Sequence, residues 1–469
     1  MIRPIGTVTV AALLCAVYLS LTLVFLGLDK FYFIMAGGQK FATFPDWNTQ
    51  LGIGLSYVTL ELIYLYWLLR KQPEQLHFTN ILRATAVFLV LGFLAYPLGD
   101  DIYLYLHFGL MNLSGVNPLI TKASSFTSGL SPFVDWGQTS TYGTVSQLFF
   151  TLFATAGSSP ILSIYLYKSF CLGLHIANGY LIWRFLQPPR SKITMAYLLN
   201  PLLLMEQVGS GHVDILVSTS LIILVGSLIA KRYTVAFIAL WGGFLAKTLP
   251  LIWMPLVSIF LVRQRAWKQL VLIIIFSLVL VATLWFTAMP GSRAWASLFN
   301  PGVSGKYHAS IHALLQSWLN LLRLSSPPIV TLLFEREILY KFTQYTSVGF
   351  AALYGWVAWR GYAKRYDSPS NLIVDIGWVT LSLLLFATPW LMPWYASILL
   401  PIAALIPQAR LFGLASLMFC LSSSSIYLLQ GLNGIESIVA IGLPALMVIL
   451  GASGSFIQTE TKTEAEAIT

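Results

Sequence analysis

The sequence predicts an all-α, polytopic membrane protein, and its composition carries that prediction. Of its 469 residues, 57% are hydrophobic and only 9% are Asp, Glu, Lys or Arg, whereas an ordinary soluble domain has about 25% charged residues. So little polar surface does not cover a water-soluble globule of this size. The 22 prolines and 34 glycines are tolerated better in membrane helices than in soluble ones. Together these observations exclude a cytosolic enzyme, a disordered protein and a nucleic-acid-binding domain.

Apolar runs of near-spanning length recur along the chain. A helix that crosses a bilayer needs about 20 apolar residues, and about fourteen runs approach that length. They lie near 5–27, 50–69, 82–98, 160–183, 193–208, 214–230, 233–246, 249–262, 269–288, 340–360, 371–388, 395–409, 411–430 and 435–452. The runs 233–246 and 249–262 are too short to cross alone, so we expect a broken or re-entrant pair there. The sequence thus predicts about 12–14 transmembrane helices.

The expected organisation is one integral membrane domain, 1–453. An extra N-terminal helix pair occupies 1–81, and a core begins at about residue 82. The first run is too long for a signal peptide and has no small-residue cleavage site, so we expect it to remain as a span. The polar residues 454–469 are expected to form a disordered cytoplasmic tail.

The net charge of +10 is a topology signal. When the N-terminus is placed inside and the runs alternate, Lys and Arg favour the inner side by roughly two to one, as the positive-inside rule requires. This arrangement predicts a multi-pass protein of the plasma membrane with both termini cytoplasmic. It also places two long segments, about 99–158 and about 289–337, on the outer side. Loops of this length are usually functional or disordered, and their aromatic and apolar content favours function.

The stretch from Tyr142 to Gly157 in the first long segment is apolar enough to be a span. A crossing here would place Arg184, Arg190 and Lys192 outside and reverse the charge rule. An amphipathic helix that lies in the outer interface keeps the rule intact. We favour this interfacial interpretation.

Two adjacent carboxylates, Asp100 and Asp101, stand where the third span emerges on the outer face. An ionisable residue at membrane depth is costly and suggests a functional site. In a low-dielectric outer cleft, one of these carboxylates could accept a proton from an attacking hydroxyl. The alternative is a helix cap at a solvated loop end, because Asp is favoured at that position.

His212 and Asp214 fall between two spans on the same outer side. In the simpler interpretation, Asp214 caps the helix that follows. In the functional one, His212 and exposed backbone N–H groups face an anion such as phosphate, or His212 and Asp214 orient a substrate hydroxyl. Lys247 is a lone ammonium among apolar residues near the outer turn of the short helix pair. It either snorkels to the interface or binds the phosphate of a lipid substrate.

Aromatic residues mark a later span boundary on the outer side. Trp394 and Tyr395 suit an interfacial aromatic belt or, alternatively, a platform on which a sugar stacks. The second long segment adds basic groups that we expect to be solvated or to contact lipid headgroups: Arg293, Lys306, His308 and His312. No residue spacing predicts a disulfide framework or a metal site.

Taken in order, these segments resemble the GT-C superfamily of membrane glycosyltransferases, most closely its polyprenyl-phosphate-mannose-dependent α-mannosyltransferases. The matching residues are Asp100-Asp101-Ile102-Tyr103, Tyr105, Gly109, Gly115-Val116-Asn117-Pro118, Tyr142-Gly143, Asn200-Pro201, Gly211-His212-Val213-Asp214, Lys247, Pro250 and Pro255, and more faintly Trp394-Tyr395. The pattern departs at Leu119 and Thr144, where the family usually has an aromatic residue and a proline.

This resemblance implies a hexosyltransferase of the GT-C type. It would move a hexose, by resemblance mannose, from a polyprenyl-phosphate donor to a hydroxyl of a glycan or glycolipid acceptor on the non-cytoplasmic face, with inversion. Asp101 matches the family's general base, with Asp100 adjacent. The implied substrate-binding residues are His212, Asp214, Lys247, Asn117, Tyr142, Trp394 and Tyr395. Interfacial helices of the first long segment would roof the site, and Asp101, His212 and Lys247 should face one outer cavity.

The expected partners are the lipid donor, the acceptor and the bilayer, with no nucleic acid. We expect no cofactor, because Lys247 and nearby basic groups could stabilise a leaving monophosphate; a divalent metal is the alternative. A second class of function also stays open, a lipid-linked saccharide flippase or other secondary transporter. Transporters place polar groups at the bilayer midplane, and here only Glu61, Lys168 and Glu206 could serve such a path. The transferase is therefore the favoured prediction.

Overall fold

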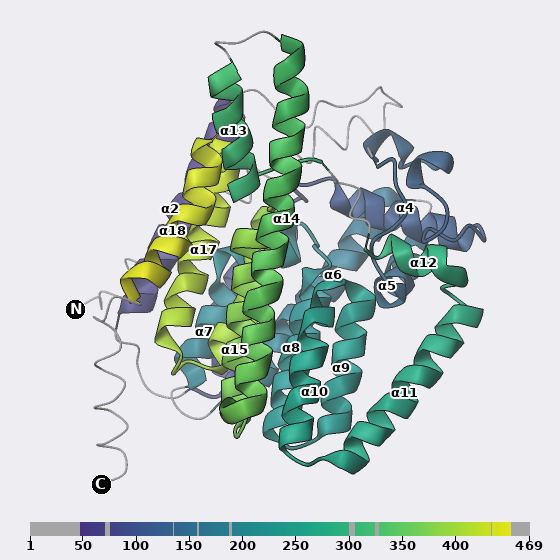
Figure 1. The fold of residues 1–469 in the computed structure, drawn as a ribbon, viewed down its shortest axis with the longest axis vertical. Coiled ribbons are helices and arrows are strands. Elements are labelled where there is room, and N and C mark those ends of the chain that lie inside the picture. Colours follow the sequence, from purple (N-terminus) through teal and green to yellow (C-terminus); the bar gives the residue numbers. More distant parts are fainter. Residues whose placement is uncertain are drawn as a thin grey trace.

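The computed structural model describes residues 47–70, 76–134, 136–156, 159–186, 190–299, 305–323, 328–432 and 434–451. The predicted first run, 5–27, and the predicted tail, 454–469, lie outside these ranges. The described residues are helical, with connecting turns and one isolated β-bridge between His308 and Trp390. The all-α class predicted from composition is therefore confirmed (Figure 1).

The helices follow one another along the chain without any strand among the described residues. The α-helices are α2 (Trp47–Leu69), α3 (Phe78–Leu94), α4 (Asp101–Leu113), α5 (Thr144–Ala154), α6 (Pro160–Phe185), α7 (Arg190–Leu199), α8 (Asp214–Ile229), α9 (Tyr233–Ala246), α10 (Trp253–Arg263), α11 (Trp267–Phe286), α12 (Gly291–Ser297), α13 (Ile311–Arg323), α14 (Pro328–Arg360), α15 (Pro369–Ser382), α16 (Leu399–Leu405), α17 (Arg410–Leu429) and α18 (Ile435–Leu450). Shorter 3-10 or π segments are η1 (Ala123–Ser125), η2 (Ser131–Phe133), η3 (Leu203–Gly209), η4 (Leu249–Ile252), η5 (Gly361–Arg365), η6 (Leu383–Ala387) and η7 (Pro393–Ile398).

The fractions of buried residues in α8 and α11 indicate what surrounds the helix bundle. Nearly every residue of α8 is buried, at the centre of the packed helices. On α11, which is as apolar, only Ile273 is buried. A helix that exposes apolar side chains around most of its circumference is stable in lipid rather than in water. The molecule is thus a multi-pass membrane protein.

Five described helices are long and apolar enough to span a membrane: Gln50–Leu69, Pro160–Phe185, Trp267–Phe286, Pro369–Ala387 and Arg410–Leu429. A sixth span results if η3 and α8, which are bent by 112° at their junction, count as one. Several other predicted runs form apolar helices of only 10–17 residues. The described long helices are therefore fewer than the predicted count of about 12–14 spans.

The short pair predicted at 233–246 and 249–262 is a hairpin. α9 ends at Ala246, the chain turns at Lys247 and Thr248, and η4 and α10 return beside α9 (Figure 1). The sharp bend within an apolar stretch lies elsewhere, between η3 and α8. His212 stands in that bend, so the break in the helix presents its side chain and backbone to neighbouring elements.

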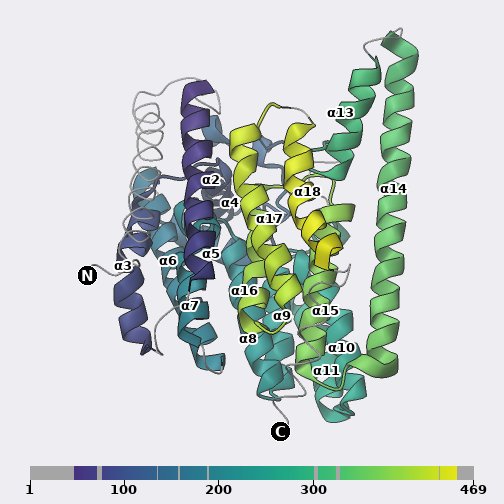
Figure 2. The same ribbon diagram turned by 90° about the vertical axis from the view of Figure 1, so that its left-hand side faces the viewer.

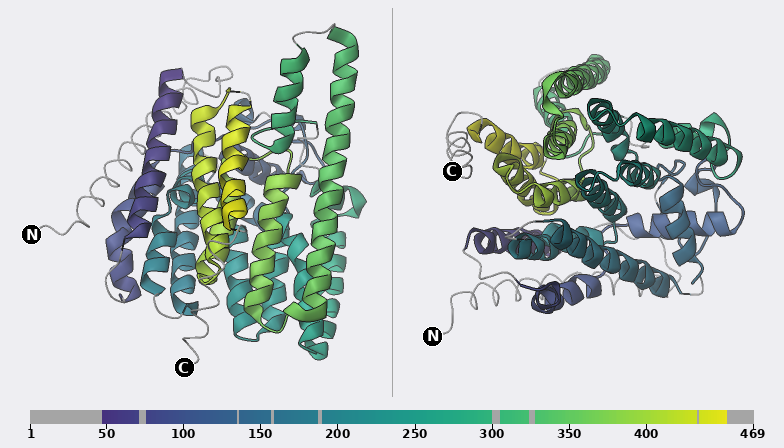
Figure 3. Two further views of the ribbon diagram at one scale, coloured as in Figure 1. Left: turned by 60° about the vertical axis from the view of Figure 1, so that its left-hand side comes forward. Right: turned by 90° about the horizontal axis from the view of Figure 1, so that it is seen from below.

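The first long segment folds into α4 and α5, which lie across the bundle when it is seen from below (Figure 3). α5 has 11 residues and is about 16 Å long, so it is too short to cross a core of about 30 Å. This length agrees with the interfacial interpretation. Two glycines permit the close packing: a Cβ on Gly109 would lie 2.2 Å from the Phe150 carbonyl oxygen, and one on Gly143 would lie 2.5 Å from that of Leu245.

The second long segment is largely helical, although it was predicted as a loop. It contains α12, α13 and the first turns of α14. Figure 2 shows α13 and α14 as a pair that extends beyond the ends of the neighbouring helices. The apolar run predicted at 340–360 is only the second part of α14, which has 33 residues.

Candidate active site

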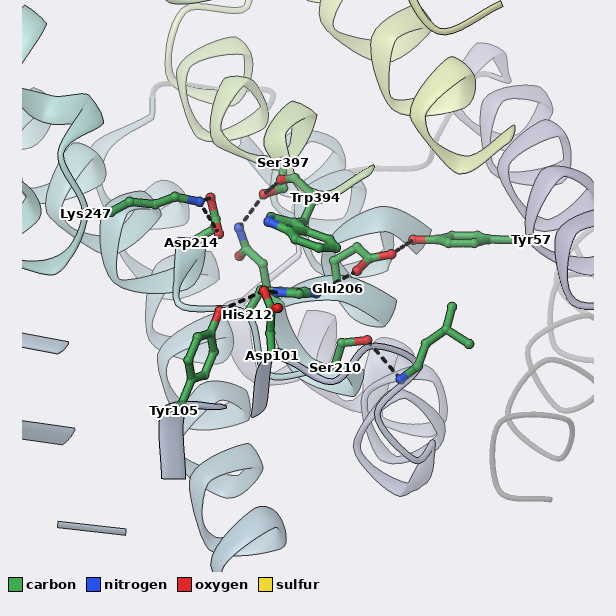
Figure 4. Close-up of polar contacts among 12 residues, drawn as sticks. Tyr57, Asp101, Tyr105, Glu206, Ser210, His212, Asp214, Lys247, Trp394 and Ser397 are labelled. Atoms are coloured by element: carbon green, nitrogen blue, oxygen red, sulfur yellow. Dashed lines mark hydrogen bonds and ion pairs between the residues drawn. The ribbon is translucent and has the colours of Figure 1, made fainter. Parts of the chain in front are cut away.

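Four elements meet at one end of the α8–α9 pair and bring polar side chains together (Figure 4). They are the start of α4, the bend between η3 and α8, the turn after α9, and η7. The bend depends on Gly211, whose φ of +69° is unfavourable for residues with a Cβ. The apolar helices thereby place several ionisable groups at a single location, although such groups are costly in an apolar interior.

Asp101, the first residue of α4, faces His212. Its Oδ2 atom lies 3.5 Å from His212 Nδ1 and accepts a hydrogen bond of 3.4 Å from the Tyr105 hydroxyl. Among the described residues, none bonds the other carboxylate oxygen, Oδ1, and the Asp101 side chain is 32% exposed. The carboxylate is thus held at one oxygen and is open to a substrate at the other.

His212 is fully buried between two carboxylates. Its Nε2 atom lies 3.2 Å from Glu206 Oε2, opposite the contact with Asp101. Both are ion-pair contacts and not aligned hydrogen bonds, because no bonded partner is found for either ring nitrogen. The Trp394 ring stacks on the imidazole with centroids 3.8 Å apart. A ring whose two nitrogens both face carboxylate oxygens is best satisfied when both carry a proton.

Glu206 continues this chain of contacts into the bundle. The Tyr57 hydroxyl on α2 donates to Glu206 Oε1 at 3.2 Å, and both side chains are buried. Asp101, His212, Glu206 and Tyr57 therefore form one continuous polar series, which Figure 4 shows running from the exposed carboxylate inward. A buried carboxylate is tolerated where a cation and a donor satisfy it.

Lys247 and Asp214 form a second charged unit beside this series. The Lys247 ammonium donates to both Asp214 oxygens, at 2.8 and 2.9 Å, and lies 4.7 Å from the centre of the Tyr395 ring. Asp214 is the first residue of α8 and is fully buried. The N-cap position of α8 is Val213, so Asp214 is not the cap of this helix, and its side chain pairs with Lys247.

An apolar cavity of about 310 Å³ adjoins this ion pair. Its polar groups come from Lys247, Thr248, Thr388 and Tyr395, and leucine, isoleucine and phenylalanine side chains form the remaining wall. Asp101 and His212 are not among the lining residues, so the three predicted groups do not share this cavity. They are linked instead through η7, because Trp394 contacts His212 and the adjacent Tyr395 contacts Lys247.

The remaining predicted residues have different positions. Asp100 immediately precedes α4 and makes no cap hydrogen bond with its side chain. Tyr142 is close to the site, with its hydroxyl 3.5 Å from that of Tyr105. Asn117 is engaged elsewhere: it donates to the Ala288 carbonyl at 3.0 Å and lines a separate cavity of about 390 Å³. Its contacts fix the loop after α4 to the segment after α11.

Sequence reasoning missed the part played by Glu206 and Tyr57. The one available signal was an acidic residue at membrane depth, six positions before His212. The other two groups considered for a midplane path have local partners, because Glu61 accepts from the Leu202 N–H at 3.1 Å and Lys168 donates to the Ala95 carbonyl. Among the described residues, no three His, Cys, Asp or Glu side chains are grouped so that they could hold a metal ion.

Comparison with known proteins relates the region that holds most of this site to a described family. Residues 34–264 match the family model described as alpha-(1->6)-mannopyranosyltransferase, N-terminal domain. These residues are thus similar to the N-terminal domain of that mannosyltransferase family. No curated protein and no solved structure was found to match the chain.

This match supports a mannosyltransferase, and hence an enzyme. The matched range includes Asp101, Glu206, His212, Asp214 and Lys247. Trp394 and Tyr395, which cover the two charged units, come from outside it. The site therefore combines the family domain with one short segment from the C-terminal part.

Proposed function

We propose that the protein transfers mannose from a polyprenyl-phosphate donor to a hydroxyl of a glycan or glycolipid, with inversion and with Asp101 as the general base. One observation carries this proposal. A half-open carboxylate, Asp101, and a half-buried ammonium, Lys247, both come from the region that matches a mannosyltransferase family, and they are linked through His212, Trp394 and Tyr395. A transferase of this kind needs a base for the acceptor and a cation for the leaving phosphate.

Asp101 suits the role of base because of how it is held. The contacts of Oδ2 with His212 and Tyr105 fix the carboxylate, while Oδ1 stays available to an acceptor hydroxyl. His212 is a positioning residue in this scheme, since its ring is fixed by Glu206 on one side and by the face of Trp394. An oriented base within hydrogen-bond reach contributes about 10²–10⁴-fold to the rate.

The region around Lys247 suits a lipid phosphate. The apolar wall of the adjoining cavity matches an isoprenoid chain, and an ammonium next to it matches the phosphate at the end of that chain. Two of the three N–H donors of Lys247 bind Asp214, which leaves one for a phosphate oxygen. Asp214 also keeps the ammonium in place when no substrate is bound.

The chemistry is a single displacement at the anomeric carbon. The acceptor oxygen attacks C1 of mannose while its proton passes to Asp101. The bond between C1 and the phosphate oxygen breaks, its electron pair stays on that oxygen, and polyprenyl phosphate leaves beside Lys247. Single displacement inverts C1, so a donor with a β linkage gives an α product. The family's description further suggests a 1→6 linkage, in which the acceptor group is a primary hydroxyl.

The location of the reaction is part of the proposal. The distribution of Lys and Arg supports a plasma-membrane protein with both termini cytoplasmic and with the site on the outer face. We propose no resident metal or other cofactor, because Lys247 can supply the positive charge. The polyprenyl donor would then reach the site within the outer leaflet.

The test is mannose transfer by the purified full-length protein. The donors are synthetic polyprenyl-phosphate mannose in its β and α forms and a nucleotide-activated mannose, with an α-linked mannose oligosaccharide as acceptor and EDTA in a parallel series. We expect transfer from the β lipid donor alone, with or without EDTA. Asp101→Asn should lower the rate by about 100-fold or more.

Two further variants make the result specific. Asp367→Asn changes an exposed surface carboxylate and serves as the matched control with wild-type activity. Asp100→Asn distinguishes the adjacent carboxylates, and loss of activity there but not at Asp101 would reassign the base. Transfer directly from the nucleotide sugar would refute the lipid donor, and inhibition by EDTA would refute metal independence.

A further inference from the structure

A third cavity, the α13–α18 cavity, is polar, lies between α13 and the start of α18 and has a volume of about 200 Å³. Gln316, Ser317 and Asn320 line it from α13, and Glu436 and Ser437 line it from α18. Side-chain amides, hydroxyls and a carboxylate supply both donors and acceptors. A lipid chain would leave these groups without partners, whereas a polyhydroxylated ligand would satisfy them.

An imidazole–carboxylate pair closes one side of this cavity. His308 Nε2 lies 3.0 Å from Glu436 Oε1, and the Glu436 side chain is only 9% exposed. His308 Nδ1 lies 3.0 Å from the Leu391 carbonyl oxygen, and its ring packs against Trp390 at 5.1 Å between centroids. His308 was expected to be solvated or to contact lipid headgroups. Instead, its contacts with Glu436 and the Leu391 carbonyl fix it in the wall of this polar cavity.

Backbone hydrogen bonds join the cavity to the segment that leads into η7. The His308 N–H donates to the Pro389 carbonyl at 3.1 Å, and the Leu391 N–H donates to the His308 carbonyl at 2.9 Å. Three residues further on, Trp394 stacks on His212. Three residues span at most about 11 Å, so the backbone beside the cavity lies within a short oligosaccharide's reach of the candidate site.

We propose that the α13–α18 cavity binds one sugar unit of the acceptor glycan, at a distance from the hydroxyl that receives mannose. The volume corresponds to roughly seven water molecules at liquid density, which suits a single hexose unit and not a longer chain. The assignment of this sugar to the acceptor rests on the proposed function. The cavity thereby selects acceptors that already carry further sugars.

Direct binding tests the cavity without turnover. The full-length Asp101→Asn protein is placed in lipid nanodiscs, and an α-(1→6)-linked mannose oligosaccharide is followed by saturation-transfer NMR. We expect binding that is weakened about tenfold by Glu436→Gln, as for the loss of one strong hydrogen bond. Asn320→Ala, at a more exposed position, tests the same wall if the Glu436 variant does not fold. Glu337→Gln, an exposed glutamate of α14, is the control and should bind normally.

Kinetics on the otherwise wild-type protein separate binding from chemistry. For the oligosaccharide acceptor, Asn320→Ala and Glu436→Gln should raise KM about tenfold and leave kcat unchanged. For methyl α-mannoside, which is too short to reach the cavity, neither KM nor kcat should change. A general loss of folding would instead lower kcat for both acceptors and would refute the selective role.

The outcomes distinguish this inference from the proposed function. If no donor supports transfer but the oligosaccharide still binds and the cavity variants weaken it, the sugar site stands and the proposed reaction fails. If transfer is robust and the cavity variants change neither binding nor the KM of the oligosaccharide, the inference is overturned and the reaction is unaffected.

Discussion

Each end of the α8–α9–α10 unit carries a pair between a Lys or Arg and an Asp, and the two pairs have very different surroundings. At the end where α8 begins and α9 stops, Lys247 pairs with Asp214, whose carboxylate is fully buried. At the end where α10 stops, Arg263 pairs with Asp367 at 2.9 Å, and the Asp367 side chain is 74% exposed. Both pairs join segments that are distant in sequence, but only the first has a carboxylate removed from solvent.

The difference in burial between the two pairs indicates which end of the unit has a functional role in addition to a structural one. Burying two charges is costly, and a pair of hydrophobic residues often stabilises a protein as well or better. A surface pair has no such cost and contributes little. The Lys247–Asp214 pair is therefore expected where its charge serves a ligand, next to His212 and the apolar cavity.

Breaking the buried pair should give the largest effect. Lys247→Met leaves the Asp214 carboxylate buried without its cation, and we expect a loss of about 3–5 kcal/mol of stability. The measurement is thermal unfolding of the purified protein in detergent. The double variant Lys247→Met/Asp214→Leu should recover most of the stability and no transfer activity. Recovery of transfer in the double variant would contradict a role for the ammonium.

Glu206→Gln should have the second-largest effect, and it should lower the rate of mannose transfer. Glutamine can still accept from Tyr57, but it removes the charge opposite His212, so His212 positions Asp101 less well. Loss of a contact to a charged group is worth about 1.5–3 kcal/mol, or roughly ten- to a hundredfold in rate. Mannose transfer measures this effect. Glu61→Gln is the matched control, a buried acid in contact with Leu202 and not with His212. An equal loss in both variants would point to general destabilisation.

A substitution that disturbs the packing of α5 against α9 should cause a smaller loss of stability. In Gly143→Ala, the new Cβ would lie 2.5 Å from the Leu245 carbonyl oxygen, so α5 must move from the end of α9 that holds Lys247. Overpacking of this kind costs about 1–3 kcal/mol. Gly137→Ala is the control, because a Cβ there meets nothing within 4 Å. Unfolding temperatures of the two variants should differ, and equal values would refute the close approach.

The exposed pair should give the smallest effect. Arg263→Ala removes the partner of Asp367 at the other end of the hairpin, and the expected loss is at most about 1 kcal/mol. Mannose transfer should be unchanged. A loss of stability comparable to that of Lys247→Met would remove the distinction between the two ends.

Much of the fold follows from the sequence because lipid permits few backbone arrangements. The run predicted at 411–430 and α17 agree within a residue at each end, as do the run at 269–288 and α11 within two. The lengths of other elements depend on packing. The run at 395–409 divides into η7 and α16, and only their neighbours in the bundle, among them α8 and α17, determine where it breaks.

The sequence indicated candidate residues of the site, singly or in short motifs, but not the pairs that they form. His212 and Asp214 were selected together, but the structure gives them separate partners, Glu206 and Lys247. These partners lie on different elements, and no local pattern connects them. For the same reason the pairing of His308 with Glu436, 128 positions apart in the sequence, could not be foreseen.

The α14 helix is longer than a bilayer core is thick, because its 33 residues extend over about 50 Å and the core measures about 30 Å. The Glu337–Lys341 pair and Arg360 enclose a stretch without charges, Phe342–Trp359, which is about 27 Å long as a helix. The turns before Lys341 then extend about 20 Å further, together with α13 (Figure 2). A polymer approaching from the water would meet this projecting hairpin first, while a membrane-bound substrate would arrive from the side.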